Sequence, residues 1–135
     1  MTRRSVFILL LATLFSVPAT ATTVLKLSLE KMALSSDLIV HGSVTRVEVV
    51  AVNGNERHLR TDVTIAVRDM IKGDRGTKEL TLKLIGGKRG KWAMQIPGMP
   101  SFTQGEEVVL FLEKTDVSYA LTGLGQGKFS VQTKD

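Results

Sequence analysis

Apolar and polar residues alternate with a period of two along much of this chain, which is typical of β-strands that bury one face. The first such stretch, residues 38–52, is rich in β-branched residues, and its apolar positions change parity between Val44 and Val47. This change predicts a bulge or sharp bend in one long strand. Gly42 fits such a bend because it has no side chain where the backbone coils tightly. Asn53-Gly54-Asn55 predicts the turn that ends the strand.

Further strands are predicted at short intervals after this turn. Residues 61–71 and 80–84 alternate cleanly between apolar and polar positions. Residues 108–112 form a continuous apolar run, which predicts a strand buried on both faces. Residues 119–121 and 128–131 supply the last strand or pair of strands.

Residues 86–103 interrupt the alternating pattern. This segment contains four glycines, two prolines and the single tryptophan, and it shows no regular periodicity. We therefore predict an irregular connection, and its length exceeds that of ordinary loops, which is typical of a functional or mobile segment.

One short helix is predicted ahead of the strands, over residues 25–34, with Ser28 as its N-cap. Its apolar residues fall on one face at helical spacing: Leu25, Leu29, Met32 and Ala33. The fold is therefore predicted to be mainly β, with one short N-terminal helix and five to six antiparallel strands in a small, closed or partly closed barrel. A β-sandwich is the alternative.

The first 21 residues have the pattern of a cleaved secretory signal peptide. Arg3 and Arg4 precede an apolar run over residues 5–17, which is shorter than the roughly 20 residues that span a bilayer. Ala19-Thr20-Ala21 then supplies a signal-peptidase site, so the mature protein is predicted to begin at Thr22. Residues 22–135 are predicted to form a single domain.

The export signal and the composition together predict a periplasmic or secreted bacterial protein. The short basic start and strongly apolar run favour Sec export over the twin-arginine route. The chain has no cysteine, which excludes a lipoprotein anchor, thiol catalysis and thiolate metal sites. No stable membrane anchor is expected to remain after cleavage.

The charge is mildly basic and gives little support for a nucleic-acid partner. Lys and Arg total 18, and removal of Arg3 and Arg4 leaves 16 against 13 acidic residues, a net charge of +3. Such a balance suits contacts with anionic surfaces but lacks the dense basic stripe of a nucleic-acid-binding protein.

The strongest candidate binding residues lie at the start of the irregular segment. Lys88, Arg89 and Lys91 provide three cations within four residues, and Trp92 follows them directly. The cations could pair with carboxylate or phosphate groups, and the indole could stack on a sugar or bind a cation. The alternative is a solvated hairpin tip, with Trp92 covering the open end of the barrel.

The second half of the irregular segment is apolar and stiffened by proline. Met94, Ile96, Met99 and Phe102 could form an adaptable contact surface, or a lid packed over the barrel mouth. If both halves face the same way, they form a cationic rim around an apolar centre, which would suit partner binding.

No motif in the sequence predicts catalysis, a cofactor or a metal site. Glu106 and Glu107 are adjacent, so on a strand they face opposite sides. His41 and His58 lack the spacing of metal ligands. The glycine-rich stretch at residues 123–127 lies outside any strand–turn–helix context and predicts a tight turn or bulge. The protein is therefore predicted not to be an enzyme.

Several short motifs carry a family resemblance. Ser36-Asp37-Leu38-Ile39-Val40-His41-Gly42, Lys72-Gly73 after the second strand, and Gly105-Glu106-Glu107 before a later strand resemble the netrin-like domain of tissue inhibitors of metalloproteinases. Pro97-Gly98-x-Pro100-x-Phe102 and Gln126-Gly127-Lys128-Phe129 resemble a group of uncharacterised secreted bacterial proteins.

The resemblance covers roughly residues 28–131 and implies an OB-like barrel, the oligonucleotide/oligosaccharide-binding architecture. Inhibitors of the animal type place an N-terminal cysteine on the catalytic zinc, and this chain has no cysteine, so that mechanism does not carry over. The sequence thus predicts a non-enzymatic exported domain that binds a protein or envelope partner through residues 86–102. Protease inhibition, suggested by the resemblance, and carbohydrate binding are the alternatives.

Overall fold

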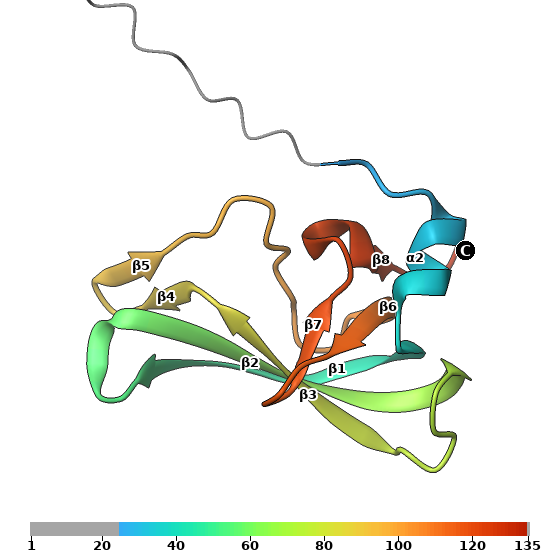
Figure 1. The fold of residues 1–135 in the computed structure, drawn as a ribbon. Coiled ribbons are helices and arrows are strands. Elements are labelled where there is room, and N and C mark those ends of the chain that lie inside the picture. Colours follow the sequence, from blue (N-terminus) through green and yellow to red (C-terminus); the bar gives the residue numbers. More distant parts are fainter. Residues whose placement is uncertain (1–24, 135) are drawn as a thin grey trace, which may run out of the picture.

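The computed structural model describes residues 25–134, and the predicted signal peptide lies outside them. Two helical elements are present there, helix α2 (Leu29–Ser35) and 3₁₀ helix η2 (Leu124–Gly127) (Figure 1). The strands of this described region are β1 (Leu38–Val52), β2 (Asn55–Lys72), β3 (Glu79–Ile85), β4 (Gly87–Arg89), β5 (Trp92–Met94), β6 (Glu107–Lys114), β7 (Tyr119–Leu121) and β8 (Lys128–Ser130).

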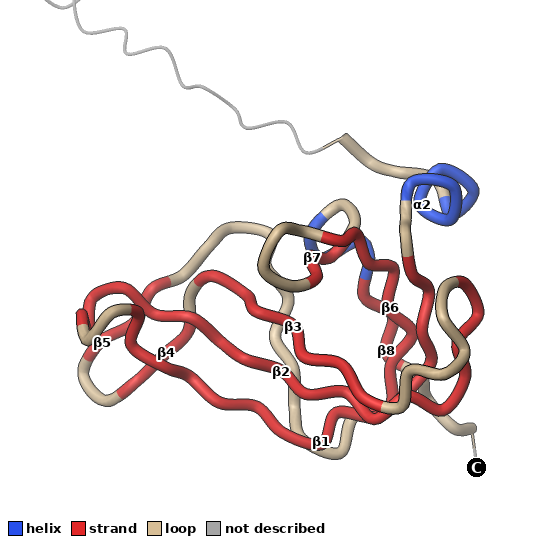
Figure 2. Tube along the Cα trace, turned by 60° about the horizontal axis from the view of Figure 1, so that its bottom comes forward, coloured by secondary structure: helices blue, strands red, loops and turns tan. Residues whose placement is uncertain are grey.

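Six of these strands form one antiparallel sheet, ordered β3-β2-β1-β6-β7 with β8 also paired to β6. On the side away from β1, β6 pairs with β8 at residues 108–110 and with β7 at residues 112–114. β7 and β8 thus behave as one strand interrupted by η2. β1 and β2 extend past the last β1–β6 pair at Ser43, and this overhanging end carries the separate β4–β5 hairpin (Figures 1 and 2).

The predicted irregularity in β1 is confirmed. Val44 pairs with Ile65 and Arg46 with Thr64, so Thr45 is a bulged residue with no partner across the β1–β2 ladder. Because of this bulge, the strand changes direction between its β6-paired half and its overhanging half.

The predicted N-cap at Ser28 is confirmed, but the predicted first residue of the helix and its predicted apolar face are not. The Ser28 hydroxyl accepts a hydrogen bond from the Lys31 amide (3.2 Å), so the helix begins at Leu29 rather than at Leu25. Met32 is buried, whereas Leu29 is 61% exposed. A seven-residue helix makes only two turns and anchors itself through one large side chain, so the predicted apolar stripe does not form.

The core has two layers on opposite faces of β1 and β6. The larger cluster lies inside the curled sheet and includes Val40, Val63, Leu82 and Leu110, each fully buried. On the other face, Met32 of α2 packs in a cluster with Ile39 and Phe111. β6 therefore has both faces covered, as its continuous apolar run predicted.

The fold class is mainly β with antiparallel strands and one α-helix in the described region, as predicted. The sheet curls so that Ser118, just before β7, donates a hydrogen bond to the Thr81 carbonyl of β3 (2.8 Å). Within residues 25–134, however, no strand pairing joins β3 to β7, so the sheet is curled but not closed into a barrel. No helix in this part of the chain is long and apolar enough to cross a membrane.

Candidate functional site

The segment that follows β3 forms a hairpin, so the prediction of an irregular connection from residue 86 is wrong for its first half. β4 and β5 pair through Gly87–Met94, Lys88–Ala93 and Arg89–Trp92. Strands of three residues are too short to show an alternating pattern, which is why the sequence did not reveal them.

Two adjacent glycines allow this hairpin to lie against the overhanging end of β1 and β2. Gly86 and Gly87 both have positive φ, +102° and +138°. A Cβ atom on Gly87 would lie only 2.7 Å from Thr61 Oγ1 and 2.8 Å from Val49 Cγ1. Thr61 also donates a hydrogen bond to the Gly86 carbonyl (2.8 Å), which fixes the point where the chain leaves β3.

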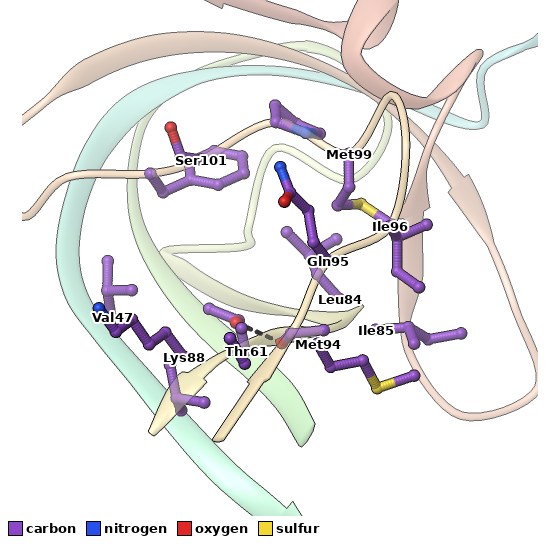
Figure 3. A pocket seen from close by; sticks show the side chains of 16 residues that line it. Val47, Thr61, Leu84, Ile85, Lys88, Met94, Gln95, Ile96, Met99 and Ser101 are labelled. Atoms are coloured by element: carbon purple, nitrogen blue, oxygen red, sulfur yellow. Dashed lines mark hydrogen bonds between the residues drawn. The ribbon is translucent and has the colours of Figure 1, made fainter. Parts of the chain in front are cut away.

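A pocket of about 520 Å³ lies between this hairpin, the main sheet and residues 95–102. Its lining includes Val47 from β1, Leu84 from β3 and Met94 from β5, and Lys88 is the single charged residue in it. In Figure 3, Lys88 stands beside Val47 at one edge, with Ile96 on the opposite side. The pocket is therefore predominantly apolar, with a cation at its rim.

The wall formed by residues 95–102 is held in place by the C-terminal part of the chain. The Gly125 amide of η2 donates to the Gly98 carbonyl (2.9 Å). The Lys128 ammonium donates to the Ser101 carbonyl (2.5 Å) and lies 4.6 Å from the Phe102 ring centroid. These contacts fix the wall although it contains no helix or strand.

Glu106 in turn holds the lysine that supports this wall. It accepts hydrogen bonds from Lys128 (2.8 Å), Ser130 (2.5 Å) and the Thr103 amide (3.1 Å). Partial burial acts to raise the pKa of Glu106, but these hydrogen bonds together outweigh it and lower the pKa. Glu106 therefore stays ionised and keeps Lys128 in position.

The tip of the hairpin carries the remaining predicted cations. The Arg57 guanidinium lies 5.1 Å and the Lys91 ammonium 5.3 Å from the Trp92 ring centroid, both within cation–π range. Trp92 therefore links the hairpin tip to the start of β2.

The structure separates the predicted site residues into two neighbouring groups. Lys88, Met94, Ile96 and Met99 line the pocket. Arg89, Lys91 and Trp92 lie at the hairpin tip outside the lining. Met99 and Phe102 also pack against the main core, as expected for the lid alternative, and the contact-surface alternative stays a prediction.

Sequence reasoning missed the residues that distant strands bring to this site: Val47, Val49, Thr61, Leu84 and Arg57. The alternation over residues 38–52 and 80–84 predicted that the valines and the leucine lie on strands, but did not show which residues lie opposite them. The adjacent glycines at positions 86 and 87 were the one available signal, since such pairs mark close backbone approach.

A second polar cluster joins three strands of the main sheet at His41. Its Nδ1 lies 3.1 Å from Asp69 Oδ2 and its Nε2 2.6 Å from Glu107 Oε1. Arg68 Nη1 contacts the same Glu107 oxygen at 3.3 Å. The hydrogen bond to Asp69, followed by that to Glu107, raises the pKa of His41. Because both ring nitrogens already face carboxylates, this cluster ties β1 to β2 and β6.

Among residues 25–134, no group of three or more His, Cys, Asp or Glu side chains is arranged to hold a metal ion. No family model, curated protein or solved structure matches this chain. The resemblance to the netrin-like family therefore stays a prediction, and the function has to be inferred from the geometry.

Proposed function

We propose that this chain is an exported, non-enzymatic binding protein that recognises a protein or envelope partner through residues 86–102. The observation that carries the proposal is the apolar pocket with Lys88 at its rim, next to a hairpin tip rich in cations. Its volume of about 520 Å³ falls in the range of roughly 300–1,000 Å³ that is typical of small-molecule sites.

The two parts of the site have complementary roles in this proposal. Burial of an apolar group in the pocket supplies affinity, at about 25 cal/mol for each Å² removed from water. The cations of the tip select anionic partners and speed their encounter. In the described region, Arg57, Lys88, Arg89 and Lys91 form no ion pair with a carboxylate, so they are available to a partner.

The carbohydrate alternative has less support, because Arg57 and Lys91 already lie over the Trp92 ring that a sugar would use. Nothing in the geometry favours protease inhibition over other protein binding.

The test is capture of a partner from envelope extract by residues 22–135. A site variant carries Lys88→Ser, Arg89→Ser, Lys91→Ser and Trp92→Ala. The matched control removes three exposed cations elsewhere, with Arg75→Ser, Lys78→Ser and Lys114→Ser. Circular dichroism of all three proteins establishes that they are folded.

We expect a stoichiometric partner to be retained by the wild type and the control and lost by the site variant. Protease treatment of the extract before capture distinguishes a protein partner from a glycan or lipid. Equal retention by the site variant and the control would contradict the proposed site.

The export part of the proposal is tested separately. Fusion of residues 1–21 to a reporter enzyme that is active only outside the cytoplasm should give activity, and replacing the apolar run over residues 5–17 with polar residues should abolish it. Activity that does not depend on the apolar run would contradict export by this signal.

A further inference from the structure

We propose that the pocket holds the hydrocarbon chain of a single-chain anionic amphiphile, whose carboxylate or phosphate head group lies at the rim beside Lys88. This inference rests on the proposed function and specifies the envelope ligand that the same site would take.

The lining of the pocket fits a hydrocarbon chain. Aliphatic and thioether side chains converge on it from three strands and from the wall segment: Val47, Val49, Leu84, Met94, Ile96 and Met99. No aspartate or glutamate is among the lining residues. A flexible chain suits such a surface, because methionine side chains adapt to irregular apolar shapes.

The lining has only four polar side chains, those of Thr61, Lys88, Gln95 and Ser101, which are too few to satisfy the backbone of an extended peptide. The Thr61 hydroxyl already donates to the Gly86 carbonyl, so its hydrogen is not free for a ligand. Peptide N–H and C=O groups that entered the pocket would lose water without gaining equivalent partners, which is costly. A hydrocarbon chain has no such groups and loses no hydrogen bonds on entry.

Charge complementarity specifies the head group. Lys88 lines the pocket, and Arg89 and Lys91 follow it at the hairpin tip. These three residues have no carboxylate partner in the described part of the chain, whereas Arg60 and Lys128 are paired with Asp62 and Glu106. An anionic group is therefore attracted to this edge, and a cationic one is repelled.

The test uses soluble amphiphiles below their aggregation concentration, with binding followed by calorimetry and by Trp92 fluorescence. Trp92 is the single tryptophan and lies next to Ala93 and Met94 of the pocket lining, so its emission reports on this site. Saturated carboxylates of about eight to fourteen carbons should bind more tightly by about fourfold per added methylene until the pocket is full.

Head groups and variants separate the two parts of the site. Alkyl phosphates should bind like the carboxylates, alcohols of equal length more weakly, and alkylammonium ions weakest. Lys88→Gln should reduce the preference for carboxylate over alcohol by about tenfold or more, and Ile96→Asn should weaken every chain. The matched controls are Lys78→Gln and Ile71→Asn, both exposed outside the pocket lining.

Failure to bind any chain, equal binding of alkylammonium and carboxylate, or equal effects of Ile96→Asn and Ile71→Asn would each overturn the inference. Its failure can be distinguished from that of the proposed function. A protein captured through residues 86–102, with no amphiphile bound, would overturn the inference alone. No captured partner and no bound amphiphile would overturn both.

Discussion

Replacement of Gly42 by alanine tests whether the close packing of β1 against β2 requires the absence of a side chain at this position. Gly42 pairs with Val67 of β2 on one side and with Val108 of β6 on the other. A Cβ atom at this position would lie 2.3 Å from the Ala66 carbonyl oxygen and 3.0 Å from Ile65 Cγ2. The first contact is with backbone, so no change of rotamer can relieve it.

The expected loss of unfolding free energy follows from the shift of the β2 backbone that the added Cβ atom would require. Overpacking of a well-ordered core typically costs about 1–3 kcal/mol. Because β2 is held between β1 and β3, we expect a loss at the upper end, about 3 kcal/mol. This is a large fraction of the roughly 5–15 kcal/mol that stabilises a domain. For a domain of this size, it corresponds to a fall in Tm of about 12 °C.

Urea unfolding followed by far-ultraviolet circular dichroism measures this loss over the whole sheet, whereas Trp92 fluorescence reports mainly on the hairpin. Gly76→Ala is the matched control, since its Cβ would approach only the flexible side chain of Asp74, at 3.2 Å. The control should change the free energy of unfolding by less than about 0.5 kcal/mol. A Gly42→Ala variant within 1 kcal/mol of wild type would refute the steric reasoning.

Three further predictions concern the core, the histidine cluster and the hairpin tip. Leu110→Ala, at a fully buried position, should lower the free energy of unfolding in urea by about 2–5 kcal/mol, and a loss under 1 kcal/mol would contradict tight packing there. The raised pKa of His41 implies stabilisation that is complete below its unfolded pKa, near 6.5, and lost as pH rises through the folded value. The difference in unfolding free energy between wild type and His41→Gln should therefore be greater at pH 6 than at pH 9 by about 0.5–1 kcal/mol. The figure is modest because the Asp69 side chain is 72% exposed. A difference independent of pH would contradict the raised pKa of His41. Arg57→Ala should shift the emission of Trp92, because it removes a cation 5.1 Å from the ring, and an unchanged spectrum would show that the two side chains do not interact in solution.

Local backbone chemistry could be predicted from the sequence. The Asn53-Gly54 turn has positive φ at both residues, 52° and 72°, as that residue pair favours. The parity change after Val44 correctly placed the bulge, and Ser28 correctly placed the helix start. Each of these signals depends on residues adjacent in the chain.

Contacts between segments that are distant in the sequence could not be predicted in the same way. The basic and apolar residues of the site were identified from residues 86–102, but the opposite wall comes from Val47 and Leu84, which are distant in sequence. Alternation shows which face of a strand is buried and not which element covers it. The failure of the sheet to close likewise depends on how far it curls, and no single residue determines that.

The extension of β1 and β2 past β6 has an evolutionary consequence. The overhanging half of these two strands supplies Val63 and Ile65 to the main core and also Val47, Val49 and Thr61 to the pocket lining. Lys88, Ala93 and Ile96 line the pocket but lie outside the core clusters, so substitutions at these positions can accumulate at little cost to folding. Such a molecule can diversify its ligand preference rapidly while its scaffold is conserved.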